Sequence, residues 1–445
     1  MLQKPLKFFI TTALLAGSSA AVALPFNSFD PRSMAMGGAG VAVGDAGMAP
    51  FFNPALLTVT REEDDFSLVL PVVGVRAYDP LDLVTSLDNF QKGNYQNNLD
   101  AAIAAYNTVG GQTPANLTAI ANNTSTYSTQ LKTLSDKPFQ AEAGAGMVVA
   151  IPSKSFGGAF YANAWLAVGG MAKYRDDQTL QNFAADANAV AACGTDPVCI
   201  ANITSTSPYF DPVTGQVTFN TNNLQSSVDI RGVGLAEMGV ALSREFAIGD
   251  ATWGFGITPK MVKVRLYDYS ESVNSGNTSN VTGNDFMAEY SHVNFDLGLA
   301  KNYGNGWRTG FVVKNVIPHT YDFKRAPTPG AAPIPTGAVI DLKPQARIGA
   351  SHTTSWSTVA MDLDLTANDP AGFENKSQYL SLGAELNAWD WAQFRLGYRA
   401  NLKDSNRNIP SIGFGLAPFG VFHFDIAAAV SSNEVGASAM LAFTF

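Results

Sequence analysis

The chain has 445 residues, a formal net charge of −9, and only 15% charged residues. Nucleic-acid binding needs a basic patch, so this acidic balance argues against a nucleic-acid partner. A mean hydropathy of +0.03 beside 40 glycines is typical of a membrane barrel wall, in which lipid-facing and lumen-facing residues offset each other.

The first 23 residues have the three parts of a secretory signal peptide. Lys4 and Lys7 form a positive start, residues 8–15 are largely apolar, and residues 21–23 (Ala-Val-Ala) form a small-x-small cleavage site. We expect cleavage after Ala23, and the alternative is a buried N-terminal helix. Because no later segment has about 18 apolar residues in a row, no helical span is predicted. The protein is therefore expected to be exported, either as a soluble protein or as a membrane barrel.

Residues 24–62 do not alternate and are rich in Gly and Ala. Glycine lets one backbone approach another closely and adopt positive φ, so we expect this segment to pack inside a barrel lumen as a hatch, or plug. The Gly37-Gly38 run is not a dinucleotide fingerprint, because the third small residue and the βαβ context are missing. No cofactor is predicted.

The segment 63–445 divides into strands by alternation of apolar and polar residues. Val359, Met361 and Leu363, for example, alternate with acidic Asp362 and Asp364. The sequence thus predicts an all-β fold, an antiparallel transmembrane barrel of about 14 strands. The expected strands are 65–75, 139–151, 157–171, 227–247, 250–267, 286–301, 306–316, 341–353, 355–366, 376–389, 391–400, 409–417, 420–431 and 435–445.

The connections distinguish a barrel from a soluble sandwich. They are very short after even-numbered strands and mostly long after odd-numbered ones, which is the pattern of outer-membrane barrels with tight periplasmic turns and longer outside loops. A Greek-key sandwich has no reason to sort its loops in this way. The sequence therefore predicts the outer membrane of a Gram-negative-type bacterium, with the lipid bilayer as a partner and both termini on the periplasmic side.

Two long loops, 76–138 and 172–226, are expected to be extracellular and partly helical, with two short helices within 95–134. The proline-rich stretch 325–336 predicts an extended exposed loop. Cys193 and Cys199 lie in a polar segment and are expected to form a small disulfide loop in an oxidising compartment. A metal site is the alternative, but only Asp196 is near, so no metal is predicted.

Two expected strands, 227–247 and 250–267, change phase along their length. In the second, Trp253, Phe255 and Ile257 give way to Val262 and Val264. We interpret such slips as bulges, or alternatively as two shorter elements in each range.

Charged residues of both signs fall on the expected lumen face. A lattice of ion pairs that stiffens the barrel and holds the plug is favoured over a polar conduit, because a wide selective pore would show one dominant sign. The candidate network is Lys343, Arg347, Asp362, Asp364, Glu385, Arg395 and Arg399.

Several blocks of the chain resemble a known superfamily. The Ser-Met-Ala-Met-Gly-Gly-Ala-Gly-Val-Ala block at 33–42 and the Ala-Pro-Phe-Phe-Asn-Pro-Ala-Leu-Leu block at 49–57 resemble the N-terminal hatch of FadL-type outer-membrane transporters of hydrophobic compounds. The candidate hatch residues are Gly37, Gly38, Asn53, Pro54 and Ala55.

Within that superfamily, the rest of the chain is closer to TraF-like proteins, named for plasmid or conjugal transfer. The matching blocks are Lys-Pro-Gln-Ala-Arg-Ile-Gly-Ala at 343–350, Asp-Leu-Asp-Leu-Thr-Ala-Asn at 362–368, Gly-Ala-Glu-Leu-Asn at 383–387 and Phe-Arg-Leu-Gly-Tyr-Arg-Ala-Asn-Leu at 394–402. The resemblance is weak in both long loops. It implies no redox chemistry, because the two cysteines do not form a Cys-x-x-Cys motif.

An enzyme is not predicted, because the chain has no Gly-x-Ser-x-Gly elbow and its four histidines are scattered. The first hypothesis is a FadL-like channel for hydrophobic small molecules, which predicts an apolar pocket beside the hatch. Strand 157–171 is its candidate side opening, because Gly157, Gly158, Gly169 and Gly170 flank it, although these glycines could instead serve turns. The alternative is a non-transporting envelope component of a transfer or attachment apparatus that binds envelope proteins and has a filled lumen.

The chain ends on an alternating apolar strand with a terminal aromatic residue. The alternation places Leu441, Phe443 and Phe445 against lipid. We expect these three residues to be the insertion signal that the barrel-assembly machinery recognises.

Overall fold

The computed structural model describes residues 29–58, 65–249, 251–272, 284–327, 332–389 and 391–445. The proposed signal peptide lies outside these residues. Fourteen antiparallel strands form a closed barrel, in which β1 pairs with both β2 and β16. The wall strands are β1 (Ser67–Tyr78), β2 (Pro138–Ile151), β3 (Gly157–Lys173), β4 (Ser227–Ile248), β5 (Ala251–Ser272), β6 (Met287–Asn302), β7 (Trp307–Lys314), β10 (Gln345–Thr353), β11 (Ser357–Asp364), β12 (Tyr379–Trp389), β13 (Ala392–Asn401), β14 (Ile409–Leu416), β15 (Phe422–Val430) and β16 (Glu434–Thr444).

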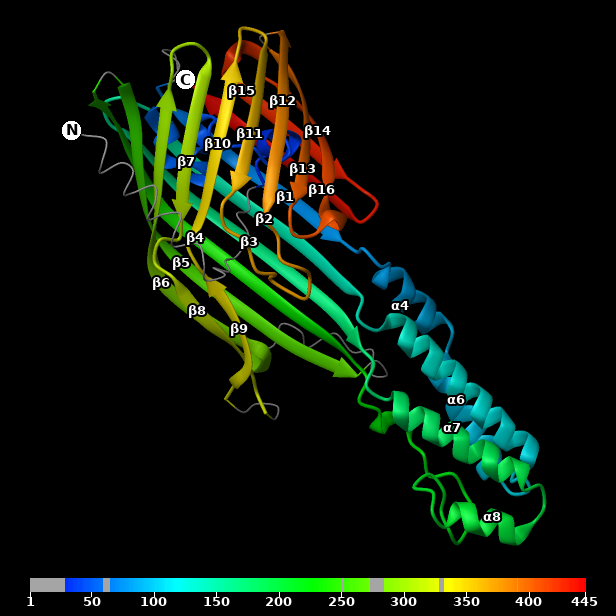
Figure 1. Ribbon diagram of the computed structural model, residues 1–445. Coiled ribbons are helices and arrows are strands. Elements are labelled where there is room, and N and C mark those ends of the chain that lie inside the picture. The colour runs from blue at the N-terminus through cyan, green and yellow to red at the C-terminus, as the bar shows by residue number, and fades with distance from the viewer. Residues whose placement is uncertain (1–28, 59–64, 250, 273–283, 328–331, 390) are drawn as a thin grey trace.

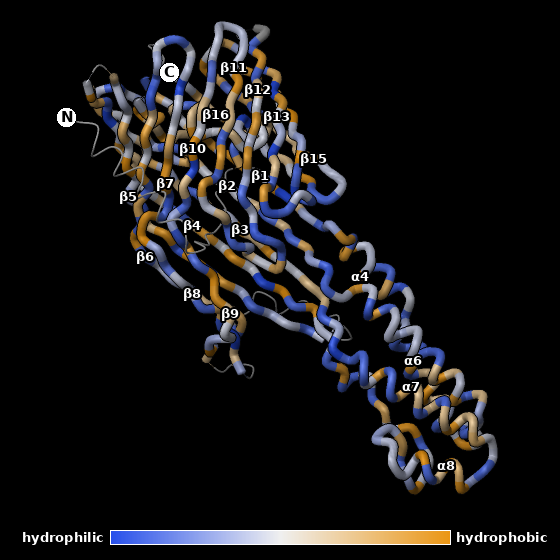
Figure 2. Tube along the Cα trace, viewed as in Figure 1, coloured by the Kyte–Doolittle hydropathy of each residue, from blue (hydrophilic) through white to orange (hydrophobic). Residues whose placement is uncertain are grey.

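The predicted fold class is confirmed, and each of the fourteen expected strands corresponds to one wall strand. Apolar and polar residues alternate along the strands (Figure 2), because side chains point in turn to the lipid and to the lumen. Exposed aromatic residues flank the short turns, as an interfacial girdle requires. They are Phe156, Trp307, Trp356, Trp391 and Phe419.

The interpretation of β4 and β5 as bulged or divided strands is wrong. Each is one continuous strand of 22 residues, and they pair with each other in an unchanged register. The phase changes because the lumen face itself turns apolar: Val262, Val264 and Leu266 all point inward and are at most 1% exposed. A register shift does occur in β1, between Val69 and Val72.

The expectation of an extended loop at 325–336 is wrong in part. The connection from β7 to β10 contains a hairpin of β8 (His319–Arg325) and β9 (Ile334–Leu342). Its residues Tyr321, Phe323, Ile340 and Leu342 are buried against the inward face of β4–β6. The signal for this hairpin was the alternation of these four apolar residues on either side of the prolines.

The two long loops form a helical arm that projects from the barrel at the end opposite the C-terminus (Figure 1). It is more helical than the two short helices expected. The arm contains α4 (Leu83–Lys92), α5 (Tyr95–Asn107), α6 (Pro114–Leu134), α7 (Asp177–Ala192) and α8 (Pro197–Thr204). The helices share an apolar core of their own, centred on Leu99, Tyr127 and Phe183.

Local signals define the helix ends in the arm. Thr113 caps α6 by accepting a hydrogen bond from the Asn116 backbone, and Asp196 caps α8 in the same way. The predicted disulfide between Cys193 and Cys199 is present and joins the end of α7 to α8. In the described part of the chain, no helix has the length and apolar character needed to cross a membrane.

Candidate functional site

Residues 29–58 fill the lumen and are called the plug from here on. The plug folds into short pieces: α2 (Pro31–Ala35), η2 (Ala46–Met48), α3 (Ala49–Phe52) and η3 (Pro54–Thr58). Asp30 caps α2 by accepting a 2.8 Å hydrogen bond from the Ser33 backbone, and Pro31 occupies the first helical position. Such short elements are not stable alone, so contacts with the wall hold the plug in shape.

Asn53 ties the plug to the wall and to itself. Its amide nitrogen donates to the carbonyl oxygens of Val41 (3.1 Å) and of Leu299 in β6 (2.9 Å). Its side-chain oxygen accepts from the backbone nitrogen of Ala55 at 3.1 Å. Pro54 packs against lumen-facing Gly256 and Gly298. The Asn-Pro-Ala motif thus links the last turn of the plug to its middle at Val41 and to β6.

Gly37 and Gly38 form the turn after α2, with φ of +69° and +98°. A Cβ on Gly37 would lie 2.5 Å from the carbonyl oxygen of Tyr398 in β13. The Gly37 nitrogen donates to the Ser411 hydroxyl at 3.2 Å. Both the positive φ and this close approach require glycine here.

Glycines of the wall strands also face the plug where the two are in contact. A Cβ on Gly397 would lie 2.1 Å from the Gly37 nitrogen, and one on Gly383 would lie 2.4 Å from the Met36 side chain. On β7, a Cβ on Gly310 would lie 2.3 Å from the Val41 carbonyl oxygen. Plug backbone therefore rests directly on wall backbone, which accounts for part of the glycine content.

Asp362 on β11 binds the plug backbone. One carboxylate oxygen accepts from the backbone nitrogens of Gly40 (2.7 Å) and Val41 (2.9 Å). Beside it, the Arg347 Nε lies 2.5 Å from Asp364, and another Arg347 nitrogen donates to the Gly38 carbonyl oxygen.

A second ion-pair chain connects α2 to three strands. Glu385 on β12 accepts from Arg32 of the plug and from Arg395 on β13, at 2.8 and 2.6 Å. Arg395 also pairs with Asp425 on β15. Arg399 lies 2.5 Å from Glu434, the first residue of β16.

Of the candidate charges, Lys343 lies apart from the others. It links β9 to β10 and pairs with Asp341 of the hairpin at 2.9 Å. The sequence prediction missed five members of the lattice, which are Arg32, Arg76, Arg407, Asp425 and Glu434. Arg32 lies in the plug, and most of the others lie near or beyond strand ends, but Asp425 lies within β15 on the lumen face, where alternation could have found it.

The sequence prediction also missed a second buried charge cluster in the lumen. Lys260 lies 2.8 Å from Glu237 and 2.9 Å from Asp296, and all three residues are at most 9% exposed. Lys314 donates to the Phe51 carbonyl oxygen of the plug at 2.9 Å. The signal was the local alternation of Met238, Val240 and Leu242 in β4 and of Phe255 and Ile257 in β5, which places Glu237 and Lys260 on the lumen face.

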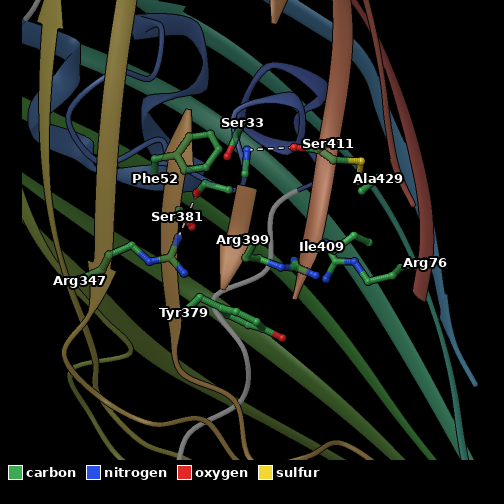
Figure 3. A pocket seen from close by; sticks show the side chains of 13 residues that line it. Ser33, Phe52, Arg76, Arg347, Tyr379, Ser381, Arg399, Ile409, Ser411 and Ala429 are labelled. Carbon is green, nitrogen blue, oxygen red and sulfur yellow. Dashed lines mark hydrogen bonds between the residues drawn. The ribbon is translucent and has the colours of Figure 1, made fainter. Parts of the chain in front are cut away.

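A cavity of about 40 Å³ lies between the plug and the wall. Figure 3 shows Arg76, Arg347 and Arg399 with Tyr379 along one side of it. The volume holds water molecules only. The apolar pocket that the channel hypothesis predicts beside the hatch is therefore not what this space provides.

The part of the lumen that the β8–β9 hairpin covers is apolar instead. Val233, Val262, Val264 and Leu266 of the wall pack with the β8–β9 hairpin. The same cluster continues to Phe29, Met34 and Ala35 of the plug. A continuous apolar contact thus runs from the hairpin to the plug.

Strand β3 has no opening in this structure. It pairs with β2 and β4 along its whole length in constant register. Two of its glycines allow close packing: a Cβ on Gly157 would lie 3.0 Å from the Leu57 carbonyl oxygen, and one on Gly169 would lie 2.7 Å from Gly372. The proposed side opening at 157–171 is therefore not supported.

A hollow of about 590 Å³ lies on the outer face of the wall across β16, β1, β2 and β3. Alanines and valines line it, among them Val73, Val75 and Ala145. The wall is thin here: Phe29 of the plug lies so close to Gly74 and Gly144 that a Cβ at either would be within 2.5 Å of its ring.

At the C-terminus, Phe443 and Phe445 are 36% and 61% exposed on the outward side of β16. The Phe445 carbonyl oxygen accepts from the backbone nitrogens of Asp65 and Phe66, so the last residue closes the barrel beside β1.

The fold and its site define a transmembrane β-barrel with the lumen filled by an N-terminal plug. Residues 50–364, more than half of the chain, match the family described as "F plasmid transfer operon, TraF, protein". The chain belongs to this family, as the sequence blocks predicted. A comparison with curated proteins found no match.

Several solved structures are similar to this chain. The Ralstonia pickettii toluene transporter TbuX has 14% identity and a TM-score of 0.48, covering 93% of this chain and 98% of that one. The P. putida toluene transporter TodX has 12% identity and a TM-score of 0.43, covering 95% and 99%. The CymD monoaromatic hydrocarbon channel has 11% identity and a TM-score of 0.33, also covering 95% and 99%.

Proposed function

We propose that this protein is an outer-membrane channel for small hydrophobic molecules, with the plug as its gate. The observation that carries the proposal is the apolar inward face of β4 and β5, where Val233, Val262, Val264 and Leu266 pack with the β8–β9 hairpin. A water-filled porin has a polar interior. Here the inward face is apolar but is covered by the β8–β9 hairpin, so a hydrophobic solute would reach it only after the hairpin moves.

Passage requires movement of the plug. The cavity beside it holds only about 40 Å³, so a hydrocarbon does not fit while the plug is in place. The apolar cluster reaches Phe29 and Met34, the plug residues that a solute would meet first. From there the solute leaves past a displaced plug toward the short-turn end of the barrel.

The outer-membrane location is part of the proposal. It is supported by the apolar outward band, the aromatic residues at the short turns and the paired C-terminal strand. The barrel-assembly machinery is the proposed partner during insertion, through outward-facing Leu441, Phe443 and Phe445.

The experiment measures uptake of radiolabelled toluene and of a radiolabelled long-chain fatty acid in a deletion strain carrying variants on a plasmid. Val264→Asp places a charge in the apolar path and is expected to reduce uptake to the level of the deletion strain. Val264→Leu preserves apolar character and should retain uptake. Heat-modifiable mobility on gels verifies that both variants assemble. Equal uptake by the parent and deletion strains would overturn the proposal that the substrate is hydrophobic.

A second candidate function is an envelope component that docks to another protein. The helical arm favours it, because the arm has its own apolar core and extends well beyond the barrel (Figure 1). Replacing residues 80–136 and 175–226 by short Gly-Ser linkers tests this role. If the arm docks a partner, plasmid-transfer or attachment frequency falls while barrel assembly and uptake persist.

A further inference from the structure

The outward face of β5 changes character part-way along the strand. From its short-turn end it carries Phe255, Ile257 and Met261, which are 36%, 41% and 60% exposed. The next two outward positions are Lys263 and Arg265. A tilted strand needs roughly 9–11 residues to cross a bilayer, so these two cations lie where the apolar layer ends on the side of the long loops.

The two cations share one acidic partner. The Lys263 Nζ lies 2.8 Å from one oxygen of Glu289 on β6, and the Arg265 Nε lies 2.7 Å from the other. Their side chains are 45% and 51% exposed, and that of Glu289 is 37% exposed. Exposed ion pairs contribute little to stability. With two cations against one carboxylate, the group keeps a net positive charge that faces outward.

The neighbouring strands leave room around this group. On β4, the residues opposite Lys263, Arg265 and Tyr267 are Ala236, Gly234 and Gly232. Opposite residues of an antiparallel pair share a face, so small residues border the cations on this side. On β6, exposed Ser291 lies opposite Lys263 and adds a hydroxyl donor.

We propose that Lys263 and Arg265, with Ser291 beside them, bind the phosphate groups of a phosphorylated lipid headgroup in the outer leaflet. Arginine presents a planar fork of donors that matches phosphate oxygens, and lysine adds a point charge. The two side chains project from the same face about 7 Å apart along the strand, a span suited to a headgroup with several phosphate oxygens. The site rests on the outer-membrane location proposed above, but not on hydrocarbon transport.

The test uses the purified full-length barrel in detergent and measures binding of diphosphorylated lipid A. The double variant Lys263→Gln/Arg265→Gln is expected to bind at least tenfold more weakly than the parent. The matched control is Lys154→Gln/Arg244→Gln, which removes two exposed cations at the short-turn end and should bind like the parent. Unchanged binding by the first double variant would overturn the site.

Glu289→Gln gives an opposite and more specific expectation. It removes the carboxylate that competes with phosphate, so lipid A binding should strengthen several-fold. A purely structural ion-pair group predicts no such gain, and unchanged or weaker binding would contradict the proposal.

Two further probes identify the source of the phosphate. Dephosphorylated lipid A is expected to bind the parent at least tenfold more weakly, and equal binding would refute phosphate recognition. Inorganic phosphate alone is expected to compete only at millimolar concentration. Competition as effective as that of lipid A would exclude the lipid as ligand. Because binding is measured on purified protein, failure here leaves the uptake result intact, and the reverse also holds.

Discussion

Arg32 of the plug and Glu385 of β12 form a two-point ion pair across 353 positions of sequence, with both nitrogen–oxygen distances at 2.8 Å. Glu385 also accepts from Arg395, so one buried carboxylate joins the plug to two strands. The pair lies at the start of the plug, whereas Asp362 anchors its middle and Asn53 its end. Movement of the plug would therefore have to break this contact.

Removing the Arg32 side chain should loosen the plug. In Arg32→Leu, Glu385 loses one of its two guanidinium partners inside the lumen, and breaking a buried pair costs about 3–5 kcal/mol. We expect more frequent openings in planar-bilayer recordings and faster proteolysis within 29–58. The control Lys92→Gln removes an exposed pair on the arm and should change neither. Recordings that match those of the parent would show that the Arg32 ion pair does not hold the plug in place.

The close contact between Gly397 and Gly37 predicts a steric effect. The Cβ in Gly397→Ala would lie 2.1 Å from the Gly37 nitrogen, and neither backbone can rotate away. We expect a displaced plug, detected as increased conductance, or a lower yield of heat-modifiable barrel. Gly158→Ala is the control, because its nearest side-chain atom lies 4.0 Å away. If Gly397→Ala has the conductance and the barrel yield of the parent, the direct backbone contact between the plug and the wall is contradicted.

The wall could be predicted from the sequence because lipid imposes strict alternation on its outer face. The prediction failed where the inner face is not polar. In β4 and β5 the lumen residues Val233, Val262 and Val264 pack on the hairpin, so both faces are apolar there and the alternation in the sequence changes phase. The β8–β9 hairpin escaped notice because the prolines between its strands dominate the local pattern.

The site was predictable only in part. Asp362 and Glu385 were found because they sit between apolar residues on regular strands. Their partners in the plug were not, since Arg32 and the Gly40 nitrogen belong to a segment with no periodicity. Which charges meet depends on closure of the barrel between β1 and β16, which brings Glu434 to Arg76. Pairing between residues so far apart in the sequence cannot be inferred from a local pattern of residues.

Plug docking should depend on pH through Asp30. Burial raises the pKa of this carboxyl to about 7, and nearby Asp425 and Asp45 add to the effect, although the Ser33 backbone bond and Arg32 oppose it. A raised pKa means that the docked plug binds the proton more tightly than the released plug. Its contribution to docking is therefore full below about pH 4 and is lost as pH rises toward 7.

We accordingly expect planar-bilayer openings to be more frequent at pH 8 than at pH 5. Asp30→Asn can still accept the bond from Ser33 but does not titrate, so this variant should open equally at both values. A parent protein whose opening frequency is the same at pH 5 and pH 8 would rule out this role for Asp30.

Deletion of Thr444 and Phe445 should impair assembly rather than export. Phe445 forms backbone bonds with Asp65 and Phe66, and its ring lies 6.3 Å from that of Phe66. The deletion removes both this closing contact and an outward aromatic residue of the proposed insertion signal. We expect less heat-modifiable barrel in the outer membrane, with signal-peptide processing unchanged. Phe445→Tyr keeps the backbone bonds and the aromatic ring and should assemble like the parent, whereas normal assembly of the deletion would refute the role of the chain end.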